Sequence, residues 1–150
     1  MTQPLHASAF SYQGAGCLLL GESGVGKTTL LSKALLYGAQ LIGDDQLQLE
    51  AVGGALFAAP AANLQGVLEL HGLGLIRYPS DGQPQRLHLA IEINPYKEAE
   101  RLPALQSRTF CGITIPAHVV QRPPEIAPLL LYVSAVQESR LLPEDWFASG

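Results

Sequence analysis

Residues 21–28 constrain the fold of this chain more than any other segment. They read Gly-Glu-Ser-Gly-Val-Gly-Lys-Thr, which is the phosphate-binding pattern of glycine, four residues, glycine, lysine and a hydroxyl residue. An apolar run at residues 17–20 precedes the loop, and a helical pattern comes after it. The order of strand, glycine loop and helix predicts a nucleotide phosphate site rather than a glycine-rich turn before an ordinary helix.

Each part of the loop has an expected role. Glycines let backbone N–H groups turn toward a phosphate, and the helix N-terminus adds a favourable dipole. We expect Lys27 to reach the outer phosphates and the Thr28 hydroxyl to ligate Mg²⁺. The expected nucleotide-binding residues are Gly21, Glu22, Ser23, Gly24, Val25, Gly26, Lys27, Thr28 and Thr29.

Composition limits the partners of such a site. A chain of 150 residues with 47% apolar residues forms one domain with a real core, which we expect to span residues 1–150. Only 15% of the residues are charged and the net charge is −4, so we expect neither nucleic acid nor a membrane as partner. No basic leader or membrane-length apolar run is present, which favours a cytoplasmic protein. We assign Cys17 and Cys111 neither a disulfide, nor catalysis, nor a metal.

The apolar pattern predicts hairpins and few helices. Strands at residues 8–12 and 17–20 form an expected hairpin, and a helix runs from Thr28 to Tyr37 with Gly38 as its C-terminal cap. Other runs read as strands, and a short helix is expected at residues 138–147. The further expected strands are residues 40–43, 46–52, 55–58, 67–70, 73–78, 86–93, 110–115, 119–120 and 128–136. The pattern therefore predicts a β-rich, largely antiparallel α/β domain, which argues against a GTPase, a transport ATPase or a typical small-metabolite kinase.

Two acidic positions are candidates for chemistry. Asp44 and Asp45 follow an expected strand, and neighbouring residues of an extended chain point to opposite sides. One acid can therefore face Mg²⁺ and the other an acceptor hydroxyl, although two solvated acids in a turn are an equal alternative. Glu69 lies in an apolar context, where it needs a metal or a partner unless it faces solvent on an edge strand. His6, taken alone, reads as a surface histidine.

Three segments together resemble the catalytic domain of the HPr kinase/phosphorylase family. They are the phosphate loop, residues 41–45 (Leu-Ile-Gly-Asp-Asp) and residues 68–75. The last reads Leu-Glu-Leu-His-Gly-Leu-Gly-Leu, which is similar to the family signature Leu-Glu-Ile-Arg-Gly-Leu-Gly-Ile. The likeness extends from about residue 6 to residue 136. It implies a single P-loop kinase domain of the HPr kinase/phosphoenolpyruvate carboxykinase-like type, as in short family members that consist of the C-terminal catalytic domain.

The resemblance also implies roles for individual residues. Asp44 becomes the general base toward the acceptor serine and the acid in the reverse reaction, with His6 in contact with it. Thr28, Asp45 and Glu69 match positions associated with Mg²⁺. Residues 100–103 (Glu-Arg-Leu-Pro) look like the catalytic loop whose arginine steadies the phosphoryl group. That arginine is Arg101 here, while Arg108 and Arg122 are alternatives.

The expected function is ATP- and Mg²⁺-dependent phosphorylation of a serine on HPr or an HPr-like phosphocarrier. Phosphate-dependent dephosphorylation, with inorganic phosphate in the loop, is the expected reverse activity, and the family implies a homohexamer. Two alternatives stay open: a P-loop kinase of small molecules, and a non-catalytic nucleotide- or phosphate-sensing module. Two departures from the family keep the second open, since His71 replaces the signature arginine and the C-terminal segment departs from the family pattern. Thr28-Thr29 in place of the usual Ser-Glu is a mild change, because threonine still offers a hydroxyl.

Overall fold

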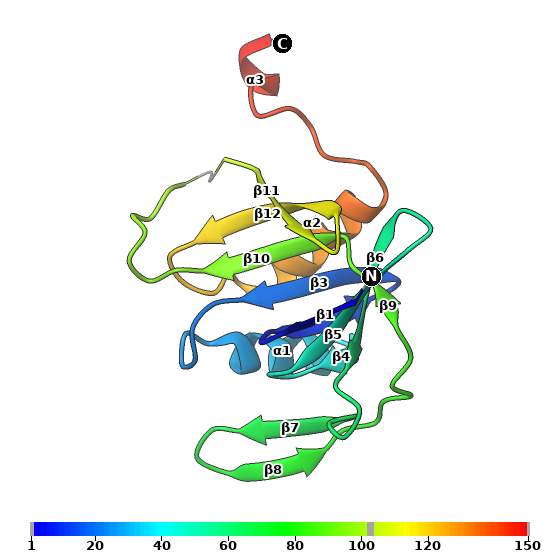
Figure 1. The fold of residues 1–150 in the computed structure, drawn as a ribbon. Coiled ribbons are helices and arrows are strands. Elements are labelled where there is room, and N and C mark those ends of the chain that lie inside the picture. The colour runs from blue at the N-terminus through cyan, green and yellow to red at the C-terminus, as the bar shows by residue number, and fades with distance from the viewer. Residues whose placement is uncertain (1, 102–103, 150) are drawn as a thin grey trace.

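A mixed six-stranded sheet forms the centre of the domain (Figure 1). The computed structural model describes residues 2–101 and 104–149. The strand order of the central sheet is β11-β12-β10-β3-β2-β4. Its strands are β2 (Ser8–Tyr12), β3 (Ala15–Leu20), β4 (Gln40–Gly43), β10 (Leu89–Ile93), β11 (Gln106–Phe110) and β12 (Ile113–Val120).

Two further sheets complete the strands. A four-stranded sheet has the order β1-β5-β6-β9, and β7 pairs with β8 in a two-stranded ribbon. Their bounds are β1 (Thr2–Leu5), β5 (Leu47–Val52), β6 (Ala55–Pro60), β7 (Val67–Leu70), β8 (Gly74–Arg77) and β9 (Gln85–Arg86). The helices are α1 (Lys27–Leu36), α2 (Ile126–Gln137) and the short α3 (Trp146–Ser149).

The domain has three layers around two apolar cores. One core joins α1 and α2 to the central sheet, and the other joins the opposite face of that sheet to the four-stranded sheet. Alternate residues of β3 enter the two cores, with Cys17 and Leu19 on the helix side and Leu18 on the other. Burial raises the pKa of the Cys17 thiol far above its usual range, so this cysteine stays protonated.

Strand direction places the phosphate loop at one edge of the central sheet. β10 runs parallel to β3 and β12, whereas the other pairs in the three sheets are antiparallel. Because β2 is antiparallel to both β3 and β4, the carboxyl ends of β3, β4, β10 and β12 lie at the same edge. The prediction of a β-rich, largely antiparallel α/β domain is confirmed, and so are the β2-β3 hairpin and the helix after the loop.

The prediction of a strand at residues 128–136 was wrong, because this segment belongs to α2. Leu129, Leu130 and Val133 are buried at helical spacing against α1 and β3, while Leu131 is 74% exposed. Apolar residues lie on both the buried and the exposed face of α2, so the helical period of its buried residues is not apparent in the sequence. Pro128 is compatible with the helix since it lies in the first turn, where backbone N–H groups have no intrahelical acceptor.

Three other segments differ from the sequence prediction. Residues 86–93 are not one strand, because β9 ends at Arg86 and β10 begins at Leu89, and these two strands belong to different sheets. Residues 110–115 are not one strand, because Cys111 and Gly112 have φ values of 52° and 75° and form the tight turn between β11 and β12. The expected helix at residues 138–147 overlaps α3 only at Trp146 and Phe147, and residues 138–145 form turns and irregular backbone instead. Within residues 2–101 and 104–149, no helix has the length and apolarity that a membrane crossing requires.

Candidate functional site

The phosphate loop connects β3 to α1 with a backbone that glycine favours. Gly21, Gly24 and Gly26 have φ values of 143°, 86° and 109°, and Gly26 is the N-cap residue of α1. A Cβ atom on Gly26 would lie 2.9 Å from Cγ of Pro123, so the loop also needs glycine there for space. These glycines give the loop the backbone conformations that a phosphate-binding loop uses to turn its N–H groups toward a ligand.

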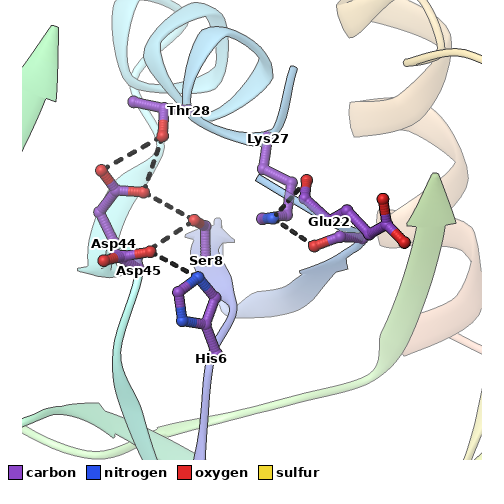
Figure 2. Close-up of polar contacts among 8 residues, drawn as sticks. His6, Ser8, Glu22, Lys27, Thr28, Asp44 and Asp45 are labelled. Atoms are coloured by element: carbon purple, nitrogen blue, oxygen red, sulfur yellow. Dashed lines mark hydrogen bonds and ion pairs between the residues drawn. The ribbon is translucent and has the colours of Figure 1, made fainter. Parts of the chain in front are cut away.

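Lys27 is a buried cation above this loop. It is 7% exposed, and its ammonium donates hydrogen bonds to the carbonyl oxygens of Gly21 and Glu22 (Figure 2). Burial lowers the pKa of Lys27, and the negative charges of Asp45 and Asp44 oppose that shift. In the described part of the chain no carboxylate forms an ion pair with Lys27. A buried ammonium held only by carbonyl groups fits an anionic phosphate ligand.

Asp44 links three elements of the fold at the edge of the central sheet. It follows β4, is 7% exposed, and its Oδ1 atom accepts a hydrogen bond of 2.6 Å from the Ser8 hydroxyl. The Thr28 hydroxyl, in the first turn of α1, donates to Oδ1 at 3.0 Å and lies 3.3 Å from Oδ2. Figure 2 shows Thr28, Asp44 and Ser8 as one connected set. A hydroxyl and a carboxylate at this position are the oxygen donors that Mg²⁺ prefers.

Asp45 points to a different partner. The left-handed backbone of Asp45, with φ of 70°, turns its side chain toward His6, whose Nε2 lies 2.8 Å from Oδ1 of Asp45 (Figure 2). Both side chains are more than half exposed, so the pair adds little to stability. The resemblance implied a contact of His6 with Asp44, and the structure corrects it to Asp45. Asp45 has a left-handed backbone, so the extended geometry expected for the two acids does not hold at this residue.

Glu69 lies apart from the phosphate loop. It is exposed on β7, in a ribbon that projects from the body of the domain (Figure 1). Among the described residues, the Glu69 side chain has no hydrogen-bond or ion-pair partner, and no three His, Cys, Asp or Glu side chains lie close enough together to hold a metal. Of the three expected Mg²⁺ positions, the structure thus brings Thr28 next to the acid pair and leaves Glu69 separate.

The candidate arginines occupy different environments. Arg101 is exposed in the segment between β10 and β11, and residues 102 and 103 of the expected catalytic loop lie outside the described residues. Arg108 on β11 donates from Nε to Glu92 at 3.1 Å. Arg108 and Glu92 line a hollow of about 540 Å³ that also touches the first two residues of the phosphate loop. Arg122 is exposed one residue before Pro123.

Ser8 is a residue of this site that sequence reasoning missed. The available signal was a polar residue within an apolar strand, two positions after His6 and therefore on the same side of an extended chain. The sequence placed this residue in the first expected strand without assigning it a role.

Comparison with known proteins identifies the family of this chain. The chain belongs to the family described as HPr Serine kinase C-terminal domain, whose profile matches residues 1–124. The HPr kinase/phosphorylase of Clostridium tetani is 34% identical over 76 residues, which are 51% of this chain and 25% of that protein. The HPr kinase/phosphorylase of Caldicellulosiruptor bescii is 24% identical over 143 residues, covering 87% of this chain and 46% of that protein. The chain therefore spans between a quarter and a half of the length of these curated relatives.

A solved structure supports the fold assignment over nearly the whole domain. The Hpr(Ser) kinase/phosphatase from Coxiella burnetii superposes with a TM-score of 0.74 and 25% sequence identity. The match covers 92% of this chain and 96% of that one. The family and the fold type implied by the sequence motifs are thus confirmed.

Proposed function

We propose that this chain transfers the γ-phosphoryl group of ATP to a serine hydroxyl of HPr or an HPr-like phosphocarrier. The observation that carries the proposal is the buried Lys27 over a glycine loop, with Asp44 held beside the loop by the Thr28 hydroxyl. Phosphoryl transfer needs a phosphate cradle, oxygen ligands for a divalent metal and a carboxylate near the acceptor. The same loop binds inorganic phosphate in the reverse reaction, phosphate-dependent dephosphorylation of phosphoserine.

In the forward direction the loop amides and Lys27 hold the outer phosphates, with Thr28 and Thr29 at the start of α1. Mg²⁺, when bound, neutralises charge on the β- and γ-phosphates. Its proposed ligands are Thr28 and Asp45, and through the family resemblance Glu69. Arg101 stabilises the negative charge of the phosphoryl group as it moves.

The proton of the acceptor serine goes to Asp44, which lies at the carboxyl edge of β4 beside the loop. The serine oxygen forms the new bond to phosphorus as the bond to the ADP oxygen breaks. In the reverse reaction a phosphate oxygen attacks phosphoserine, and Asp44 returns the proton to the serine oxygen that leaves. His6 acts on this pair of acids through Asp45, its neighbour at 2.8 Å.

The contacts also support an alternative assignment, in which the two acids exchange the roles of general base and metal ligand. The Thr28 hydroxyl donates a hydrogen bond to Asp44, whereas the exposed Asp45 contacts the imidazole of His6, to which it can pass a proton. In this version Asp44 and Thr28 lie on the metal side and Asp45 accepts the serine proton. Single Asp→Asn variants separate the two versions by their dependence on Mg²⁺.

We further propose that the protein works as a homo-oligomer, a hexamer by family resemblance, in the cytoplasm. Support for self-association comes from the β7-β8 ribbon, where Leu73 and Leu75 are 87% and 72% exposed. Size-exclusion chromatography with light scattering gives the mass in solution. A monomer at micromolar concentration would contradict the oligomer proposal and leave the catalytic proposal intact.

The first experiment incubates the purified chain with labelled ATP, Mg²⁺ and the HPr-type proteins of the same organism. We expect acid-stable phosphoserine on one of them, since phosphohistidine is lost in acid. The Lys27→Ala variant is the control for contaminating kinases. Phosphorylation of small molecules alone would favour the small-molecule kinase, and ATP binding without any transfer would favour the sensing module.

A further inference from the structure

We propose that Ser8 is a positioning residue for the acid pair: its buried hydroxyl holds the Asp44 carboxylate in the orientation that phosphoryl transfer requires. The proposal rests on the proposed function and assigns a role to a residue outside the phosphate loop and the acid pair. Ser8 is 1% exposed, so its hydroxyl acts through Asp44 and does not reach an acceptor.

The hydrogen bonds of Ser8 reach both acids. Its Oγ atom donates to Oδ1 of Asp44 at 2.6 Å, a short distance typical of a bond to a charged oxygen. The same atom lies 3.4 Å from the backbone N–H of Asp45, which donates to it. One hydroxyl therefore links the Asp44 side chain to the backbone of the left-handed residue that comes next.

The backbone of Ser8 is held by the central sheet. β2 pairs on one side with β3, which leads into the phosphate loop, and on the other with β4, which leads into the acids. Ser8 lies opposite Leu19 of β3, and the next residue, Ala9, lies opposite Gly43, directly before Asp44. The Ser8 hydroxyl thus fixes Asp44 relative to the same strand that positions the loop.

Ser8 also differs from Thr28, the other hydroxyl on Asp44. Thr28 is a proposed ligand of Mg²⁺, so its hydroxyl would bind the metal as well as Asp44. Among the described residues, the Ser8 side chain forms hydrogen bonds with Asp44 and Asp45 alone. A carboxylate fixed from two sides keeps its position when one partner engages the metal. Small displacements of a catalytic group lower rates by up to about a hundredfold. Loss of the Ser8 hydroxyl should therefore cause a measurable fall in the transfer rate.

The test compares Ser8→Thr with Ser8→Val, two side chains of nearly equal size that differ in the hydroxyl. We expect Ser8→Thr to transfer phosphate within about threefold of the wild-type kcat, and Ser8→Val to lose about tenfold to a hundredfold. The KM for ATP should stay within about threefold in both, because the loop is unchanged. Equal losses in both variants would assign Ser8 to packing, and unchanged transfer by Ser8→Val would overturn the proposal. If Ser8→Val does not fold, Ser8→Ala replaces it and is compared directly with the wild type, with a melting curve to show that it is folded.

Crystal structures of the same three proteins test the proposal without turnover. We expect Asp44 to keep its contact with Thr28 and residue 8 in the wild type and in Ser8→Thr, and to change its side-chain orientation in Ser8→Val. An unchanged Asp44 in Ser8→Val would contradict the positioning role. If the wild type phosphorylates no HPr-type protein, the proposed function fails, and the structures still decide the role of Ser8.

Discussion

The Thr28 hydroxyl and the Asp44 carboxylate lie 3.0 Å apart, although Thr28 lies in the first turn of α1 and Asp44 follows β4. This contact joins the phosphate loop to the acid pair and makes them one site. Asp45, the next residue along the chain, forms an exposed pair with His6. Each of these groups has a distinct expected response to substitution.

Asp44→Asn should retain ATP binding and lose at least about a hundredfold in transfer rate, in line with general-base contributions of this size. Asp45→Asn should mainly raise the Mg²⁺ concentration at half-maximal rate, because Asp45 is the proposed ligand. Steady-state transfer to HPr at several Mg²⁺ concentrations measures both effects. The opposite pattern would support the alternative assignment, with Asp45 as general base and Asp44 as metal ligand.

Glu69→Gln tests the Mg²⁺ role that rests on family resemblance alone. If Glu69 reaches the metal during the reaction, this variant should need severalfold more Mg²⁺ at saturating ATP. The matched control is Glu50→Gln, which changes an exposed glutamate on β5. Identical Mg²⁺ titrations for the two variants would place Glu69 among the solvent-facing residues of the ribbon.

Arg101→Ala should lower the transfer rate by about a hundredfold or more with little change in ATP binding, because the arginine acts on charge that develops during transfer. Arg108→Ala should have a smaller effect, since its guanidinium is already paired with Glu92. Single-turnover rates with pre-bound ATP separate transfer from binding. A larger loss in Arg108→Ala would move the role to the arginine beside the 540 Å³ hollow.

Gly26→Ala should weaken phosphate binding and destabilise the fold more than Gly38→Ala. Both glycines have left-handed φ values, 109° and 97°, so both substitutions introduce strain of about 1–2 kcal/mol. Only the Cβ at residue 26 would also meet the Pro123 ring, at 2.9 Å, because nothing lies within 4 Å at Gly38. Urea unfolding gives the two stability changes. Equal values would show that Pro123 moves aside without cost.

Unfolding should become easier as the pH falls below about 6.5. Burial lowers the pKa of His88, with Arg86 acting in the same direction, and burial lowers the pKa of His118, opposed by Glu144. Between the lowered values and 6.5 the unfolded chain binds more protons, so stability is lost as pH falls through that window. The free energy of unfolding measured from pH 8 to pH 5 checks the sign.

The variants for this pH effect are His118→Gln and, as control, His71→Gln at an exposed position. Nε2 of His118 bonds the Tyr132 hydroxyl at 2.6 Å, and its Nδ1 atom is buried with no partner among the described residues. We expect a shallower pH dependence only in His118→Gln. The same slope in both variants and the wild type would exclude His118 as the source.

The sequence by itself determined the parts of this protein that depend on neighbours along the chain. The glycine spacing specified the phosphate loop, helical spacing after Thr28 specified α1, and the alternation with turn glycines specified the β2-β3 hairpin. The acids after β4 were also visible, since an Asp pair at the end of a strand is a local pattern. These features depend on backbone freedom and side-chain period, which act over a few residues.

Only the tertiary structure decided which side chains meet. Residues 128–136 form a helix whose residues at helical spacing pack against α1 and β3. The apolar run in the sequence did not distinguish this helix from a strand. His6 pairs with Asp45 because of a left-handed turn, and Ser8 reaches Asp44 because β2 lies between β3 and β4. The contacts of Ser8 with the two acids join positions 36 and 37 residues apart, so they depend on strand order and register. No local pattern encodes that order, so the motifs indicated the chemistry and the packing of the sheet determined its geometry.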